Sequence, residues 1–254
     1  MKNIIVLFIT VMILFSCGIC RKYTSDDKAS KKEDTKTETS KTEKESSEEV
    51  KKESTTKENK SNASVEMLNF DKSDLPSEIK YTGNIVTGKR WTDRNGENIL
   101  ILTKTGFRET RARKPVLNDY EKDCELYGYH YVNSGGAFSL LWKINDFVKE
   151  CPLDLTLDFI PGSLSITDLN DNGIAESTFL YKMACRGDVS PSDLKLIMHE
   201  NETKYALRGN MLVKVEGFSG GGSYKVDKAF DSAPDGFLDY AKTLWKEFKL
   251  ETFK

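Results

Sequence analysis

The segment DLNDNGIAE, residues 168–176, carries oxygen ligands at alternate positions around a glycine. Calcium takes six to eight oxygens, and a short loop supplies them when alternate side chains point inward and a glycine permits a sharp turn. The predicted ligands are Asp168, Asn170, Asn172, the backbone carbonyl of Ile174, and Glu176. The spacing therefore predicts a structural Ca²⁺ site. Because only two of the side-chain ligands are charged, we expect a weak affinity, roughly 10⁻⁴–10⁻³ M.

The residues around this loop distinguish it from an EF-hand. An EF-hand has a glutamate at position twelve, where this sequence has Phe179, and it has helices where this sequence has strand-like runs. The loop resembles instead the Asp-x-Asp-x-Asp-Gly loops of integrin-type propeller blades and other extracellular β-modules. The alternative is a plain hairpin turn, since Asn172-Gly173 is by itself a strong turn pattern. A turn does not require Asp168 or Glu176, so their joint placement favours the ion.

Few other residues have the spacing of a reactive site. His130 and His199 are the only histidines, and both lie inside strand-like runs, where a packed histidine is commoner than a catalytic one. Zinc requires several Cys or His ligands at short spacing, and none cluster here. We therefore predict no catalytic residues, and an enzyme that acts on envelope polysaccharide is the alternative.

Three short motifs have a structural explanation beside the functional one. The tripeptide RGD, residues 186–188, matches an adhesion motif, but a tight turn after Cys185 also accounts for it. The stretch GFSGGGSYK, residues 217–225, lacks the Gly-Lys-Ser/Thr of a phosphate-binding loop, so we expect a flexible turn. Trp91 and tyrosine residues are candidates for a sugar-binding platform, although aromatic strand residues usually belong to the core.

Three cysteines, Cys124, Cys151 and Cys185, lie in the part of the chain that has a globular composition. In an oxidising compartment an odd number permits one bridge and one leftover thiol. We expect Cys151 to pair with Cys185, because each flanks an extended segment and the two segments could lie side by side. The sequence does not fix this connectivity.

The elements that must position these residues are mostly strands. Short runs rich in β-branched and aromatic residues are separated by Gly, Asn, Asp and Pro at hairpin-like spacing. These runs cover residues 98–107, 125–133, 137–146, 153–159, 163–168, 177–185, 194–200 and 204–209. The pattern predicts a mainly β fold with antiparallel sheets, arranged like a sandwich or like the hairpins of a partial propeller. An α+β fold is the alternative.

The end of the chain follows a different period. Apolar residues recur there at intervals of three and four: Phe237, Leu238, Ala241, Leu244, Trp245 and Phe248. This spacing predicts an amphipathic helix over about 235–249, beginning at Pro234 or Asp235. Because an apolar stripe must be buried, we expect the helix to cover one face of a sheet.

The chain begins like a bacterial lipoprotein. Lys2 is followed by an apolar run from Ile4 to Phe15, which is the layout of a secretory signal and is too short to span a membrane. Leu14, Ser16 and Cys17 resemble a lipobox, so residues 1–16 are the expected signal peptide and Cys17 the lipidated residue. Two or three acyl chains anchor a protein stably. Gly18 after the cysteine favours the outer membrane. A soluble or periplasm-facing protein is the alternative.

Residues 17–63 have the composition of a tether. Beyond the first few residues they are almost all Lys, Glu, Ser, Thr and Asp, and cannot bury enough apolar surface to order themselves. The charged residues after Cys17 resemble the surface-export signals of some Gram-negative lipoproteins, and a solvated spacer is the alternative. Residues 64–254 form the expected single β-rich domain. The net charge of −2 gives no basic field, so nucleic acid is not an expected partner.

Two segments of the domain are similar to each other. WTDRNGENILILTK from Trp91 and ITDLNDNGIAESTFLYK from Ile166 share Thr-Asp-x-Asn, a glycine, a polar pair and an apolar run that ends in lysine. Two units are too few for a repeat family. They predict two similar hairpins in one antiparallel sheet system.

Three longer stretches resemble a family of exported Gram-negative proteins labelled surface polysaccharide biosynthesis protein. They are LLWKINDFVKECPLDL, LSITDLNDNGIAESTFLYKMACRGDVSPSDLKLIMHENETKYALRG and APDGFLDYAKTLW, within residues 91–246. The features that carry the resemblance are Cys151, the 168–176 loop, Cys185 and the segment 187–192. It implies a role in making or displaying surface polysaccharide, without a defined reaction.

These observations predict a surface-exposed outer-membrane lipoprotein with a calcium-stabilised β domain. Its expected partners are the membrane, through the lipid anchor, and surface polysaccharide or the machinery that assembles it. A purely structural or adhesive surface protein is a further alternative.

Overall fold

The structure is a computed structural model of the chain and describes residues 64–113 and 118–253. The predicted signal peptide, Cys17 and the predicted tether lie outside the described residues. Within the described part, no helix is long and apolar enough to cross a membrane.

The first sheet has six antiparallel strands arranged around a long central strand. Its strands are β1 (Glu66–Leu68), β2 (Asn84–Asp93), β3 (Gly96–Lys104), β4 (Arg108–Arg111), β5 (Tyr120–Asn133) and β6 (Ser139–Cys151). One edge of β5 pairs with β3 and then with β4, while the other edge pairs with β6. Strands β2 and β1 extend the sheet beyond β3.

The second sheet also has six antiparallel strands. They are β7 (Asp154–Phe159), β8 (Ser165–Thr167), β9 (Glu176–Arg186), β10 (Asp193–Glu200), β11 (Thr203–Asn210) and β14 (Tyr224–Val226). The order is β14-β11-β10-β9-β7, and β8 pairs with the start of β9. A small third sheet contains β12 (Leu212–Val215), β13 (Phe218–Gly221) and β15 (Leu250–Glu251). There, β12 and β15 are parallel.

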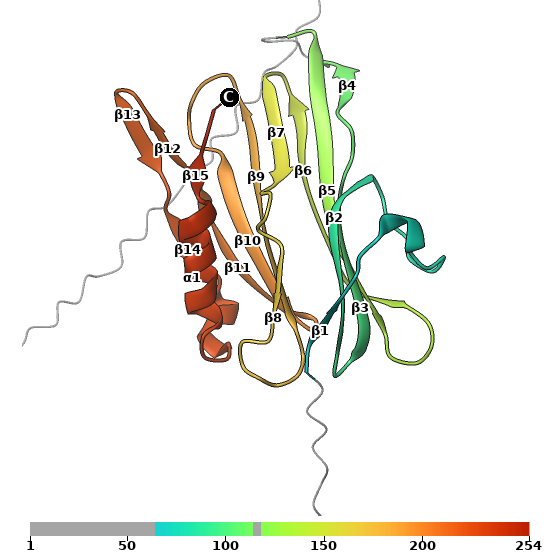
Figure 1. Cartoon of the computed structure of the whole chain (residues 1–254). Coiled ribbons are helices and arrows are strands. Elements are labelled where there is room, and N and C mark those ends of the chain that lie inside the picture. Colours follow the sequence, from blue (N-terminus) through green and yellow to red (C-terminus); the bar gives the residue numbers. More distant parts are fainter. Residues whose placement is uncertain (1–63, 114–117, 254) are drawn as a thin grey trace, which may run out of the picture. The chain divides into compact units, whose positions relative to one another are not determined.

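The two large sheets pack face to face (Figure 1). A shared apolar cluster fills the space between them, with Leu100, Leu102 and Leu126 from the first sheet and Phe179 and Ile197 from the second. The predicted mainly β fold with antiparallel sheets is confirmed, and the sheets form a sandwich rather than propeller-like hairpins.

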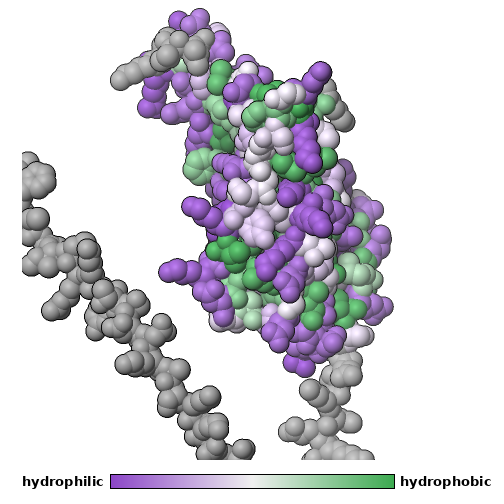
Figure 2. All heavy atoms as spheres, turned by 90° about the vertical axis from the view of Figure 1, so that its left-hand side faces the viewer, coloured by the Kyte–Doolittle hydropathy of each residue, from purple (hydrophilic) through white to green (hydrophobic). Residues whose placement is uncertain are grey.

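Helix α1 (Phe237–Phe248) confirms the predicted C-terminal helix. It begins later than expected, because Gly236, with φ of 89°, is the N-cap residue. Its buried stripe of Phe237, Ala241, Leu244 and Trp245 packs on the outer face of the second sheet. A 3₁₀ turn, η2 (Lys228–Ser232), leads into it. Figure 2 shows this side of the molecule, where hydrophilic side chains surround smaller hydrophobic areas.

The segment before β2 covers the outer face of the first sheet. It contains a 3₁₀ turn, η1 (Lys72–Asp74), and packs Ile79 against Tyr129 and Tyr131. The Tyr131 hydroxyl donates to the backbone oxygen of Lys80 at 2.6 Å. Both large sheets are therefore covered in part on their outer faces, which explains why strands such as β3 and β9 read as nearly continuous apolar runs.

The glycine-rich stretch 217–225 is more ordered than expected. Phe218–Gly221 forms strand β13, which pairs along its whole length with β12. The residues of this stretch outside strands are Gly217, which forms the β12–β13 turn with Glu216, and Gly222 and Ser223, which connect β13 to β14. The prediction of a flexible turn over the whole stretch is wrong, because backbone pairing orders even a glycine-rich strand.

Candidate metal site at the hairpin ends

Three hairpin turns meet at the lower end of the sandwich in Figure 1. They are the β2–β3 turn, the loop between β8 and β9, and the β10–β11 turn. The Arg94 amide donates to the Gly173 carbonyl at 2.8 Å, and the Asn95 side-chain amide donates to Asn201 Oδ1 at 2.5 Å. The predicted calcium loop therefore contacts the β2–β3 turn, and that turn contacts the β10–β11 turn.

The loop folds tightly upon its own backbone. Asp168 accepts hydrogen bonds through both oxygens, from the amides of Asn172 at 3.0 Å and Gly173 at 2.9 Å. Asn170 Oδ1 accepts from the Asn172 amide at 3.2 Å, and Asn172 Oδ1 accepts from the Ile174 amide at 2.7 Å. Gly173 has φ of 76°, which favours glycine. The structure thus turns the side chains of Asp168, Asn170 and Asn172 toward backbone amides of one tight loop, while Glu176 lies at the start of β9.

Glu176 is the most unusual residue of the site. It is the first residue of β9 and has 0% of its surface exposed. Its Oε2 accepts from the Thr167 hydroxyl and the Leu169 amide, both at 2.9 Å, whereas its Oε1 has no partner among the described residues. Burial raises the pKa of Glu176 to about 7, with a smaller contribution from the charge of Glu200. A buried carboxylate of this kind requires a proton or a cation.

Glu200 belongs to the same site and was not predicted. It is the last residue of β10 and lies directly opposite Glu176 in the antiparallel register. Its Oε1 accepts from the side-chain amides of Asn170 at 2.9 Å and Asn172 at 2.6 Å. Only the strand register brings Glu200 to the loop, and sequence patterns do not give register.

Acidic side chains alone do not form a metal site here. Among the described residues, no three His, Cys, Asp or Glu side chains lie together as a metal-binding group. A cation at this loop would therefore also use amide and backbone oxygens. Such mixed oxygen ligands suit calcium, which accepts carboxylates, amide carbonyls and water together.

Asp93 joins the two segments that resemble each other in sequence. It accepts from Trp91 Nε1 at 3.0 Å, from the Asn95 amide at 2.8 Å and from the Ala175 amide at 3.1 Å. Each segment forms a hairpin, as predicted, but the hairpins belong to different sheets. The prediction of one sheet system is wrong here, because the segments meet through their loops rather than through strand pairing.

The histidines and Cys124 are packed in the core. Burial lowers the pKa of both His130 and His199 to about 3, so both rings are neutral. His199 stacks on Trp142 with ring centroids 4.0 Å apart. Cys124 is a buried free thiol, and burial raises its pKa. Such groups do not reach a substrate in this conformation.

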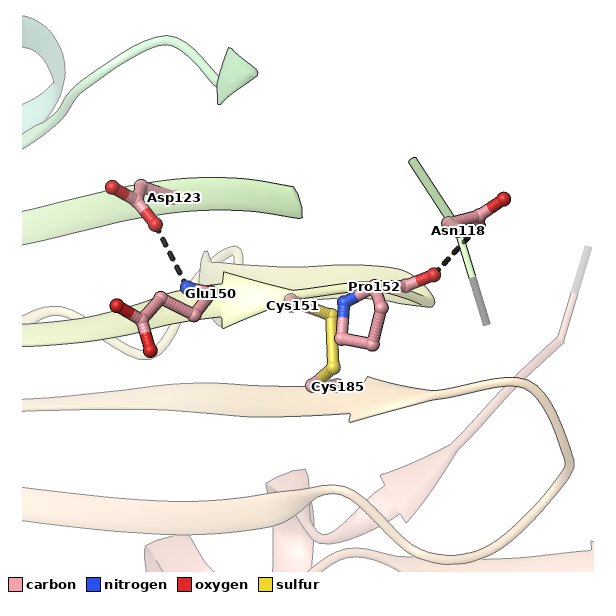
Figure 3. The surroundings of a disulfide bond; sticks show 6 residues. All are labelled: Asn118, Asp123, Glu150, Cys151, Pro152 and Cys185. Atoms are coloured by element: carbon pink, nitrogen blue, oxygen red, sulfur yellow. Dashed lines mark hydrogen bonds between the residues drawn. A yellow bond between two sulfur atoms is a disulfide. The ribbon is translucent and has the colours of Figure 1, made fainter. Parts of the chain in front are cut away.

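The structure bridges Cys151 and Cys185, the pair expected from the sequence (Figure 3). Their Cα atoms lie 5.6 Å apart, within the usual range. Glu150, with φ of 52°, occupies an irregularity in the β5–β6 pairing, and its amide donates to Asp123 at 2.8 Å. This local bend precedes the bridge that joins β6 of one sheet to β9 of the other.

Two of the short motifs are not available for binding. Arg186 of the RGD tripeptide donates to Glu251, a residue with only 3% of its surface exposed. Trp91 is completely buried, and Trp142 and Trp245 are buried as well. The tripeptide therefore does not present its arginine to solvent, and no tryptophan of the chain forms an exposed sugar platform.

Comparisons with known proteins add little to this geometry. No family model matches the chain, and no solved structure matches it. A Drosophila melanogaster protein named probable ubiquitin carboxyl-terminal hydrolase FAF is 27% identical over 125 residues. The match spans 48% of this chain and only 4% of that protein, so it shows no family. The resemblance to the surface polysaccharide family stays a prediction.

Proposed function

We propose that the protein is a surface-displayed outer-membrane lipoprotein whose β-sandwich binds calcium at the 168–176 loop. The ion is structural, and the domain assists surface-polysaccharide assembly or binds glycan. The observation that carries the calcium site is Glu176 Oε1, a completely buried carboxylate oxygen without a hydrogen-bond partner among the described residues. Buried charges are normally paired or bound to metal.

The loop supplies further oxygens next to this carboxylate. Asn170 and Asn172 both contact Glu200, which faces Glu176 across the β9–β10 pair. A calcium ion at this place would neutralise the two opposed carboxylates. It would also tie the β8–β9 loop to the β10–β11 turn, which gives the ion a stabilising role.

The cellular location of the protein is proposed from its sequence. The lipobox-like residues before Cys17 support lipidation, and the charged stretch after it supports surface display. The bridge between Cys151 and Cys185 supports an oxidising compartment, because such bonds persist in exported proteins. Incorporation of labelled palmitate into the full chain, lost in Cys17→Ser, tests the anchor.

The polysaccharide role is supported by the family resemblance alone. We propose binding rather than catalysis, because Glu176, the carboxyl group with the raised pKa, has no exposed surface through which to contact a substrate. Retention of the chain on immobilised capsule or lipopolysaccharide would support a glycan role. Absence of retention would favour a purely structural or adhesive surface protein.

The calcium site is tested by the melting temperature of the full chain, measured by tryptophan fluorescence with chelator and with up to several millimolar calcium. Calcium should raise the melting temperature, because it binds only the folded state. Asp168→Ala should lose this rise. Asp171→Asn is the matched control, since Asp171 is exposed in the same loop and already has φ of 51°. If added calcium leaves the melting temperature of the wild type unchanged, the loop is a plain hairpin turn without a calcium site.

A further inference from the structure

Glu176 and Glu200 form a pair of like charges on one face of the second sheet. They lie directly opposite each other in the β9–β10 register. Opposed residues of an antiparallel pair have Cβ atoms about 5 Å apart, and like charges in this arrangement destabilise the sheet. A bound cation would convert this repulsion into attraction.

Both carboxylate oxygens of the predicted ligand Asp168 already accept hydrogen bonds. Each of its oxygens accepts a backbone amide of the loop, at 3.0 and 2.9 Å. This is the arrangement of a residue that shapes a turn. Glu200, in contrast, contacts side chains alone, the amides of Asn170 and Asn172. Rotation of these amides by half a turn would present their oxygens to an ion beside Glu200, at the cost of the hydrogen bonds that the two oxygens now accept from the Asn172 and Ile174 amides.

We propose that Glu200 is a direct ligand of the calcium ion, together with Glu176, and that Asp168 shapes the loop instead of contacting the ion. This inference rests on the proposed calcium site and changes its composition. The ligands then come from two adjacent hairpins, the loop before β9 and the end of β10. The ion consequently crosslinks two strand pairs rather than pinning a single turn.

The test is a calcium titration of the full chain by isothermal titration calorimetry, with melting temperatures measured in parallel. Glu200→Gln removes the charge but keeps an oxygen that accepts from Asn170 and Asn172, so the fold should persist. Its dissociation constant for calcium should rise at least tenfold, and its calcium-induced rise in melting temperature should become correspondingly smaller. Glu202→Gln, an exposed change in the same hairpin, is the matched control and should bind like the wild type.

The outcomes separate the two proposals. If wild type and Glu200→Gln bind calcium equally well, Glu200 is not a ligand and the proposed loop site stands without it. If neither the wild type nor Glu202→Gln binds calcium, the proposed site itself is wrong. If Glu200→Gln melts at a much lower temperature than the wild type in chelator, Glu200 contributes to folding. Calcium binding is then measured at a temperature at which the variant is still folded. Binding as tight as that of the wild type would overturn the role of Glu200 as a ligand.

Discussion

Arg186 and Glu251 form a two-point ion pair between β9 and the short last strand β15. Arg186 Nη2 lies 2.7 Å from Glu251 Oε1, and Nη1 lies 3.2 Å from Oε2. Ser192 donates to the same carboxylate through its amide at 3.0 Å and its hydroxyl at 2.7 Å, and Lys182 approaches within 3.3 Å. Glu251 is therefore a buried charge with a full set of donors, the condition under which such a pair is stable.

Replacement of Glu251 should destabilise the domain strongly. Glu251→Gln leaves Arg186 beside a neutral group, and removal of one partner of a buried pair costs about 3 kcal/mol or more. For a domain of this size, that loss lowers the melting temperature by roughly 6–12 °C. Glu247→Gln, an exposed change in α1, is the control and should melt within about 1 °C of the wild type. Equal melting temperatures of Glu251→Gln and Glu247→Gln would show that the ion pair does not stabilise the domain.

The Glu251 carboxylate should also make the free energy of unfolding depend on pH in the acidic range. Burial alone would raise the pKa of Glu251, but hydrogen bonds from Arg186 and Ser192 outweigh it and lower the pKa from 4.5 to about 2. A lowered pKa contributes stability above pH 4.5 that is lost as the pH falls toward 2. Urea unfolding should therefore show a difference between wild type and Glu251→Gln that narrows across this range. A constant difference would show that Glu251 does not titrate in this way.

The bridge between Cys151 and Cys185 should stabilise the fold, because it restricts the conformations of the unfolded chain. It closes a loop across 34 residues of sequence separation, and such loops correspond to about 3–4 kcal/mol. A Cys151→Ser, Cys185→Ser double variant should lose about this much unfolding free energy in a urea titration and should therefore unfold at a lower urea concentration. Cys124→Ala should keep the crosslinked peptide in a non-reducing digest. A crosslink that includes Cys124 in the wild type would contradict the assigned pairing.

Asp93 should stabilise the contact between the β2–β3 hairpin and the loop before β9. Asp93→Ala leaves the buried Trp91 indole N–H and the Ala175 amide without their acceptor, and each such buried donor costs about 1–3 kcal/mol. We expect a loss of unfolding free energy of about 2–6 kcal/mol, measured by urea titration. Asp93→Asn retains one acceptor oxygen and should lose less. Asp154→Asn, an exposed change in β7, should have no measurable effect.

Most of the predicted strands have apolar residues on both faces, although β6, which was also predicted, alternates between exposed and less exposed residues. Strands β3, β5 and β9 to β11 are buried between layers, so their runs of β-branched and aromatic residues were evident. Strand β2 was missed because it mixes polar residues with Gly88. The reason for this glycine is tertiary: a Cβ there would lie 2.3 Å from the ring of Phe70.

The site was predicted only where it is local in sequence. The 168–176 loop follows from the spacing of its own residues. Glu200 and Asp93 reach it through strand register and loop packing, and Glu251 reaches Arg186 across 65 residues. Such contacts depend on the arrangement of sheets, which periodicity and turn patterns do not specify.

The position of Glu251 also orders events during synthesis. The ribosome releases Lys182, Arg186 and Ser192 before their shared acceptor, which follows 59 to 69 residues later. Until then, Lys182 and Arg186 lack the counter-charge that they contact in the folded domain. This cluster of ion pairs therefore forms only after β9 and β10 have been made, and a copy truncated before Glu251 would fold without it.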